Sequence, residues 1–280
     1  MPKSDVLSAI QQAMNVGQQV VQQRVGSHSH SHKDLSRREK LGVLMTQQSY
    51  KDPNKRQYKV KGYKYQPQFS SEKYSVYKNK KGRYQLSVRG TVPLHGLGER
   101  SGDLGQDVEI MKGSFNQNSS QVVDTQNLVG KILAQDPKAR GNIGLNGHSL
   151  GGRIVLEALH DPRNEGVFRD SVALAPGFSP LGDAAEQARQ EKLVTGKKNR
   201  NFVVGVANDL VWSGNKAMHR GGSNVKILKA KDSKLTGAHN NHFLTAFSGK
   251  PGGSLSVSGS NQFYRPPNMY HRHEKKNIKN

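Results

Sequence analysis

The stretch from residue 142 to residue 160, N-I-G-L-N-G-H-S-L-G-G-R-I-V-L-E-A-L-H, decides the fold of this chain. Asn142 to Asn146 is a short apolar run typical of a buried strand, and Leu150 to His160 has the periodicity of a helix. The turn between them reads G-H-S-L-G. A sharp strand-to-helix turn of this kind raises the hydroxyl of Ser149 above a sheet, and its glycines relieve crowding. We therefore predict a nucleophilic serine at a helix N-terminus, where developing negative charge is favoured.

Strands and helices alternate on both sides of this turn. Strands are expected over 84–89, 171–175, 202–206 and 224–228, and helices over 34–50, 120–135 and 183–193. Such alternation indicates a mainly parallel sheet with helices on both faces. The expected fold class is α/β, in one domain over residues 34–249.

The composition excludes several classes of protein. The 280 residues include 43 Lys and Arg, 21 Asp and Glu and no Cys, for a formal net charge of +22. A disulfide scaffold, a thiol nucleophile and a Cys-ligated metal site are therefore excluded. No run of about 18 apolar residues is present, so we expect no membrane-spanning helix. We also identify no signal peptide and expect a location inside a cell or a virus particle.

Two extensions flank the expected domain. In the first, residues 1–33, the stretch from Ser4 to Val25 has apolar residues at spacings of three and four, which predicts an amphipathic helix. Its polar face is rich in Gln rather than Lys, which favours docking on this domain or on a protein partner over docking on a membrane. Gly26 to His32 reads G-S-H-S-H-S-H, a linker of solvated histidines. The second extension, residues 250–280, is expected to be a flexible basic tail.

A strongly basic stretch runs from Lys51 to Arg83. It holds eleven Lys and Arg against Asp52 and Glu72, a net charge of +9, with tyrosines between them. Alternation of Lys with Val and Tyr predicts hairpin strands with a charged outer face. The lysines could simply protect a solvated sheet edge. Alternatively, together with the C-terminal tail, they bind an anionic membrane surface or nucleic acid.

A serine nucleophile needs a histidine base and an acid that orients the histidine. The apolar strand expected over 202–206 runs into A-N-D-L-V, which places Asp209 just past the carboxyl end of a strand. Ligand sites of parallel sheets lie at that end, so Asp209 is the preferred acid. Asp183 and Asp232 are alternatives that do not directly follow a strong apolar strand.

Two histidines compete for the role of base, His239 and His242 in G-A-H-N-N-H-F-L-T-A-F. Phe243, Leu244 and Phe247 follow His242 and could anchor a short helix that positions its ring, so His242 is preferred. His219 comes only ten residues after Asp209 and is less suitable, and His148 and His160 are interpreted as motif filler and helix end.

Five stretches together resemble the class 3 lipases, α/β-hydrolases of the fungal-lipase type: V-R-G-T at 88–91, D-L-G-Q-D-V at 103–108, G-H-S-L-G-G at 147–152, N-D-L-V at 208–211 and H-F-L-T-A-F at 242–247. They occur in the order found in that family. The resemblance implies an α/β-hydrolase fold and a triad of Ser149, Asp209 and His242. It also implies two oxyanion-hole donors, Thr91 and the backbone N–H of Leu150. No metal or organic cofactor is implied.

We therefore expect a serine carboxylic-ester hydrolase, similar to a lipase or phospholipase, that acts on a lipid ester. The segment 92–119, where a lid would lie, is rich in Gly, Ser and charge. Short esters or phospholipids thus fit better than emulsified triglyceride. The alternative is an internal structural or nucleic-acid-associated protein of a virus particle that carries a lipase-like domain, active or not. The charge, the N-terminal helix and the basic tail favour that alternative.

Overall fold

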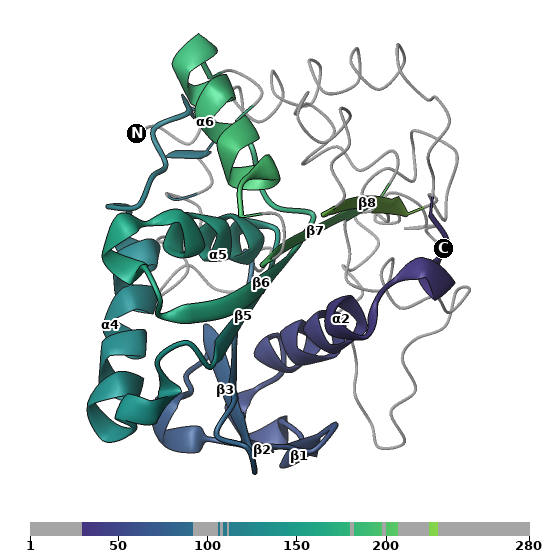
Figure 1. Cartoon of the computed structure of the whole chain (residues 1–280), viewed down its shortest axis with the longest axis vertical. Helices are drawn as coiled ribbons and strands as arrows, with labels where there is room; N and C mark the ends of the chain where they lie inside the picture. Colours follow the sequence, from purple (N-terminus) through teal and green to yellow (C-terminus); the bar gives the residue numbers. More distant parts are fainter. Residues whose placement is uncertain are drawn as a thin grey trace, which may run out of the picture.

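The computed structural model describes residues 30–91, 106, 109–110, 112–179, 182–197, 200–206 and 224–228. Within these ranges, one eight-stranded sheet forms the centre of the molecule, with the strands side by side in chain order (Figure 1). The strands are β1 Lys59–Val60, β2 Tyr63–Tyr65, β3 Tyr74–Asn79, β4 Tyr84–Val88, β5 Ile143–His148, β6 Phe168–Leu174, β7 Asn201–Val206 and β8 Val225–Leu228.

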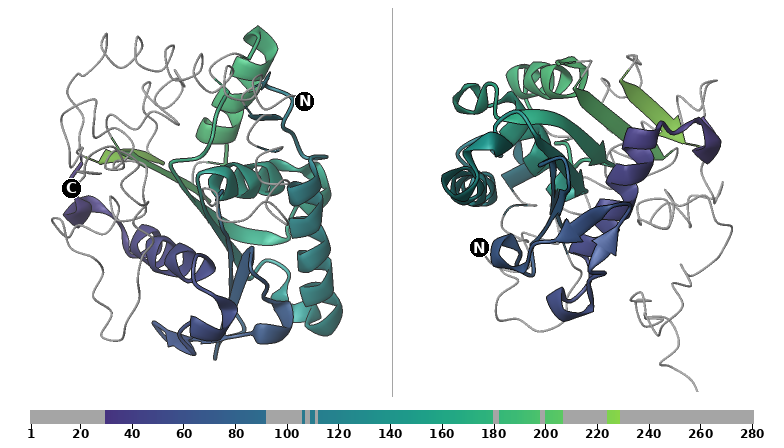
Figure 2. Two further views of the ribbon diagram at one scale, coloured as in Figure 1. Left: turned by 180° about the vertical axis from the view of Figure 1, so that it is seen from behind. Right: turned by 60° about the horizontal axis from the view of Figure 1, so that its bottom comes forward.

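The sheet has an antiparallel part and a parallel part. Strands β1 to β4 pair antiparallel, and β4 to β8 pair parallel. Helices α4 (Ser120–Gln135), α5 (Leu150–His160) and α6 (Ala184–Thr195) each precede the next parallel strand and lie on one face of the sheet. Helix α2 (Arg37–Ser49) lies on the other face (Figures 1 and 2). The expected α/β class, with helices on both faces of a mainly parallel sheet, is confirmed.

The helices begin at or close to the residues that the sequence predicts. Both α4 and α5 have the predicted bounds, and α6 begins after its cap Asp183. Helix α2 begins three residues later than predicted because Ser36 forms a capping box with Glu39. The backbone N–H of Glu39 donates to the Ser36 hydroxyl at 3.2 Å, and Ser36 N–H donates to the Glu39 carboxylate at 2.5 Å.

Part of the predicted N-terminal linker is paired with the sheet. The N–H of His30 donates to the carbonyl of Ile227 at 2.6 Å, beside β8. His30 is therefore paired with the domain and is only partly exposed. The helix predicted over Ser4–Val25 and the tail over 250–280 lie outside the described residues.

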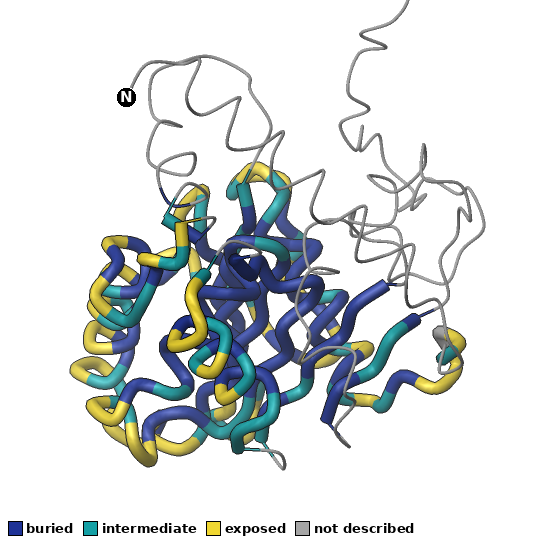
Figure 3. The backbone as a smooth tube through the Cα atoms, turned by 90° about the horizontal axis from the view of Figure 1, so that it is seen from above, coloured by how far each residue is buried: buried dark blue, intermediate teal, exposed yellow. Residues whose placement is uncertain are grey.

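The core lies between the parallel strands and the helices that cover them. Every residue of β4 and β5 is buried. Figure 3 shows that buried residues gather at the centre of the described chain and exposed residues at its periphery. Helix α2 approaches the sheet at Gly42, where a Cβ would lie 2.7 Å from the Cβ of Val172. Tyr50 is the residue directly after α2. Among the described helices, none has the length and apolarity that crossing a membrane requires.

Candidate active site

The turn between β5 and α5 holds Ser149 in a strained conformation. Its φ of 57° and ψ of −125° are unfavourable for a residue with a Cβ. The backbone is held there on both sides: Ser149 N–H donates to Leu174 O at 2.9 Å, and Ser149 O accepts from Arg153 N and from Gly177 N at 3.0 and 3.2 Å. The Ser149 side chain does not cap α5, and the residue is only partly buried. The predicted strand, sharp turn and helix are therefore present.

Three glycines make this turn possible because a side chain at any of them would collide with backbone. A Cβ at Gly147 would overlap the carbonyl of Gly151, and one at Gly151 would overlap the carbonyl of Val88. A Cβ at Gly90 would lie 2.5 Å from His148 O and 3.0 Å from the Ser149 Cβ. The end of β4 is therefore in direct contact with the elbow, an arrangement that the predicted oxyanion hole requires.

The two predicted oxyanion-hole residues belong to these touching segments. Leu150 is the first residue of α5, and the first backbone N–H groups of a helix have no acceptor within the helix. Thr91 follows Gly90 at the end of β4. Ser149, Leu150 and the Gly90–Thr91 segment are thus brought together by the fold. Their catalytic roles stay predictions.

A tyrosine that the sequence did not single out ties these segments together. The hydroxyl of Tyr50 accepts a hydrogen bond from Gly90 N–H at 2.9 Å. It also forms a hydrogen bond with Nδ1 of His148 at 2.8 Å. The two rings also meet edge to face, with centroids 5.8 Å apart. His148, interpreted from the sequence as motif filler, is 4% exposed and links the elbow strand to Tyr50 at the end of α2. No sequence signal marks Tyr50, because its partners are 40 and 98 residues away.

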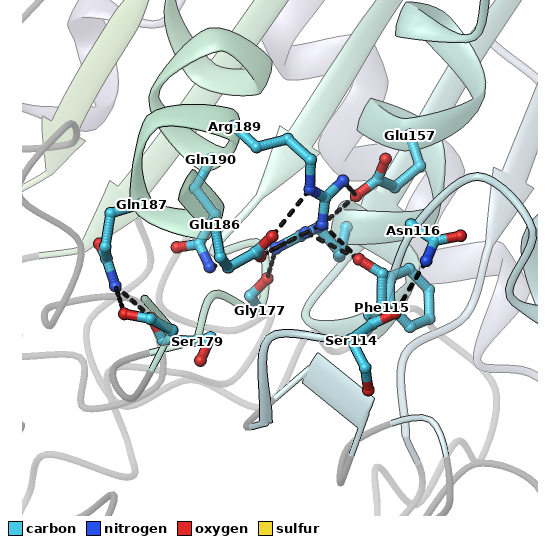
Figure 4. Close-up of polar contacts among 12 residues, drawn as sticks. Ser114, Phe115, Asn116, Glu157, Gly177, Ser179, Glu186, Gln187, Arg189 and Gln190 are labelled. Carbon is cyan, nitrogen blue, oxygen red and sulfur yellow. Dashed lines mark hydrogen bonds and ion pairs between the residues drawn. The ribbon is translucent and has the colours of Figure 1, made fainter. Parts of the chain in front are cut away.

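A buried charge cluster supports the other side of the elbow (Figure 4). Arg153, fully buried one turn into α5, contacts Glu157 at 2.8 Å and Glu186 at 3.1 Å. Arg189 of α6 contacts the same two carboxylates at 2.5 and 2.7 Å. Buried charges need such paired, hydrogen-bonded arrangements. The cluster thereby fixes α5 relative to α6.

The same cluster also holds two loops beside the elbow. Both arginines donate to the carbonyl of Phe115, and Arg153 donates to the carbonyl of Gly177 at 3.4 Å. Gly177 in turn donates its N–H to Ser149 O. Burial alone would raise the pKa of Glu186, but hydrogen bonds from Arg189, Gln190 and Arg153 outweigh it and lower that pKa. Glu186 therefore stays ionised in the folded protein at neutral pH.

The remaining sequence candidates have the following positions. Asp183, an alternative acid, caps α6 by accepting a hydrogen bond from Glu186 N–H at 2.8 Å. Its side chain therefore has a structural role at the start of that helix. His160 does lie at a helix end: its Nδ1 is 2.9 Å from Leu156 O, and burial lowers its pKa. Asp209, His242, His239, Asp232 and His219 lie outside the described residues; β7 ends at Val206, three residues before Asp209 in the sequence. No group of three or more His, Asp or Glu that could hold a metal occurs among the residues that the structure describes.

A mainly parallel sheet with helices on both faces and a strained serine between a central strand and its helix define an α/β-hydrolase fold. No family model matches the sequence, and no curated protein matches it.

Several solved structures are similar to this chain, at low identity. Lip2 lipase of Yarrowia lipolytica is 16% identical, with 66% of this chain and 77% of that chain covered and a TM-score of 0.39. Extracellular lipase LipA of Serratia marcescens is 18% identical over 56% of this chain, with a TM-score of 0.30; this chain spans only 26% of that lipase. An arylesterase is 14% identical, with 85% and 96% covered and a TM-score of 0.34.

Proposed function

We propose that this protein is a serine carboxylic-ester hydrolase of the class 3 lipase type that acts on a lipid ester. The observation that carries the proposal is the strained Ser149 turn with the end of β4 packed directly against it. A conformation that costs of order 1–3 kcal/mol persists where the surrounding structure enforces it, and such strain clusters at functional sites.

The proposed reaction uses groups from four segments. His242, oriented by Asp209, takes the proton of the Ser149 hydroxyl, and the Ser149 oxygen bonds to the ester carbonyl carbon. The backbone N–H of Leu150 and the Thr91 group stabilise the oxyanion. The ester C–O bond breaks, His242 protonates the departing alcohol, and water then releases the acid from Ser149. The Tyr50 and Arg153 contacts keep the turn and its neighbours in place before substrate arrives.

The experiment is covalent labelling of the full chain with a fluorophosphonate, followed by peptide mapping. We expect label on Ser149 alone, and loss of both labelling and short-chain ester hydrolysis in Ser149→Ala. Removal of a serine nucleophile leaves about 10³–10⁴ of rate enhancement over water from the rest of the site. Ser120→Ala, an exposed helix position, is the matched control and should behave as wild type.

Label on another residue, or an active Ser149→Ala protein, would contradict the proposal. Thermal unfolding of each variant checks that the fold is intact. A panel of p-nitrophenyl esters of increasing chain length then tests the substrate class, with short chains expected to be preferred.

A further inference from the structure

The basic residues of the central region gather at one end of the sheet. The turn between β1 and β2 carries Lys61, and the turn between β3 and β4 carries Lys80, Lys81 and Arg83. The turn between α4 and β5 carries Lys138 and Arg140. These three turns adjoin one another: Tyr63 pairs with Asn79, and Tyr84 N–H donates to Asn142 O at 2.9 Å. We call these six cations the basic end.

The positive charge of the basic end is uncompensated. All six side chains are exposed, and none forms an ion pair with a carboxylate of the described residues. Acidic residues near this end each have a cation of their own: Asp136 contacts Lys78 at 2.8 Å, Asp161 contacts Arg163 at 2.5 Å, and Glu165 contacts Lys197 at 3.1 Å. The end is therefore a site of concentrated positive potential.

Strand register adds two more cations to one face beside it. Lys59 lies directly opposite Lys64, and Lys64 lies directly opposite Lys78. Directly opposite residues of antiparallel strands have their Cβ atoms about 4.5–5.5 Å apart on the same face, and like charges there destabilise the sheet. Lys78 forms an ion pair with Asp136, but Lys59 and Lys64 form none with an acidic residue of the described chain. An external anion would relieve this repulsion.

Protection of a sheet edge explains only part of this pattern. Lysines on the edge strand β1 do discourage pairing with other chains. Lys138 and Arg140, however, precede β5, a central strand, and Lys80, Lys81 and Arg83 flank β4, which is paired on both sides. Protection of a sheet edge therefore does not explain these five residues.

The basic end and the candidate active site lie at opposite ends of the parallel strands. Ser149 follows the last residue of β5, whereas Arg140 precedes its first residue, Ile143. Ser149 is six residues further along the chain than Ile143, which corresponds to about 20 Å at about 3.3 Å per residue of strand. A membrane bound flat to the basic end would therefore face away from Ser149. Insertion into a bilayer would also need exposed large apolar side chains. Among the described residues only Tyr58 is of this kind, and it is 69% exposed.

We propose that the basic end is a docking surface for the phosphate backbone of a nucleic acid, separate from the hydrolase site. Cations from three adjacent turns can follow successive phosphates, and Tyr58, exposed directly before the edge strand β1, is available to stack on an unpaired base. The site at Ser149 stays open while the polyanion is bound.

The test compares two triple variants of the full chain that lose the same charge. The first, Lys61→Asn, Lys81→Gln and Arg140→Gln, takes one cation from each turn; Asn suits the left-handed backbone of position 61, where φ is 48°. The matched control replaces Arg37, Lys40 and Lys192 with Gln, all exposed residues outside the basic end. Binding of a 20-nucleotide single-stranded DNA is measured by fluorescence anisotropy over a range of salt concentrations.

We expect the first triple variant to lose about tenfold or more in DNA affinity near 0.1 M salt. Its slope of log affinity against log salt should fall by about 2, because each lost phosphate contact on single strands contributes about 0.7. The control should keep most of the wild-type slope. Both variants should keep wild-type thermal unfolding and hydrolysis of a small uncharged ester.

Equal loss in the two triple variants would overturn the proposal, because binding would then depend on total charge alone. So would unchanged DNA binding combined with lost binding to vesicles of phosphatidylcholine and phosphatidylserine, which would make the surface a membrane site. Wild-type protein that binds no DNA would overturn it as well.

Discussion

Replacement of Tyr50 by Phe removes one oxygen atom at the point where three segments meet. The hydroxyl accepts from Gly90 N–H at 2.9 Å and is hydrogen-bonded to Nδ1 of His148 at 2.8 Å, so the variant removes the bridge between Gly90 and His148 while the pairing of β4 with β5 remains. The phenyl ring and its packing remain. The change therefore tests whether the hydroxyl positions Thr91 for catalysis.

The size of the effect follows from what is lost. A hydrogen bond contributes about 0.5–1.5 kcal/mol net, and a buried group left without a partner costs about 1–3 kcal/mol. We expect a loss of about 1–3 kcal/mol in the free energy of unfolding. Removing an oxyanion-hole donor outright costs about 10²–10³ in kcat, and Tyr50 only positions one, so we expect kcat to fall by about tenfold to a hundredfold. KM should change little, because the ground-state ester makes weaker use of the donors than the oxyanion does.

The assay is steady-state hydrolysis of a short p-nitrophenyl ester, together with thermal unfolding. Tyr77→Phe is the matched control: the Tyr77 hydroxyl donates to Gln57 O at 2.9 Å in the antiparallel part of the sheet, and the residue is fully buried. This control should lose stability to a similar extent but keep kcat. Wild-type kcat in Tyr50→Phe, or an equal loss of kcat in both variants, would refute the positioning role.

Three further predictions test other parts of the site. His242→Ala should abolish ester hydrolysis, whereas His239→Ala should cost much less; the reverse order would assign the base to His239. Gly151→Ala should unfold the protein or abolish activity, because its Cβ overlaps the carbonyl of Val88, whereas Gly130→Ala in α4, where a Cβ meets nothing within 4 Å, should stabilise by about 1 kcal/mol. Because the pKa of Glu186 is lowered on folding, its contribution to stability is complete above the ordinary value of 4.5 and is lost as the pH falls through the lowered value. The free energy of unfolding of Glu186→Gln should therefore be lower than that of the wild type at pH 7. Between pH 7 and pH 3 it should decrease less steeply than the wild-type value.

Local patterns were enough to predict the elements because the signals that specify them are local. The stripe of apolar residues in α4 and the G-H-S-L-G turn before α5 depend on neighbours within a few residues, and both helices have their predicted bounds. The alternation of strands with helices also predicted a mainly parallel sheet, which the pairing of β4 to β8 confirms, but it did not predict the order of the strands. The sequence by itself thus determined the α/β class and the position of Ser149 between strand and helix.

The tertiary structure decided which distant residues support that serine. Arginine is rarely fully buried without a partner, and Arg153 is fully buried because Glu157 and Glu186 supply partners from two helices. Tyr50 and His148 meet across 98 residues, a contact that no local periodicity can encode. The net charge from Lys51 to Arg83 can likewise be obtained from the sequence. Only the order and direction of the strands place Lys61, Lys81 and Arg140 together at the end of the sheet opposite Ser149.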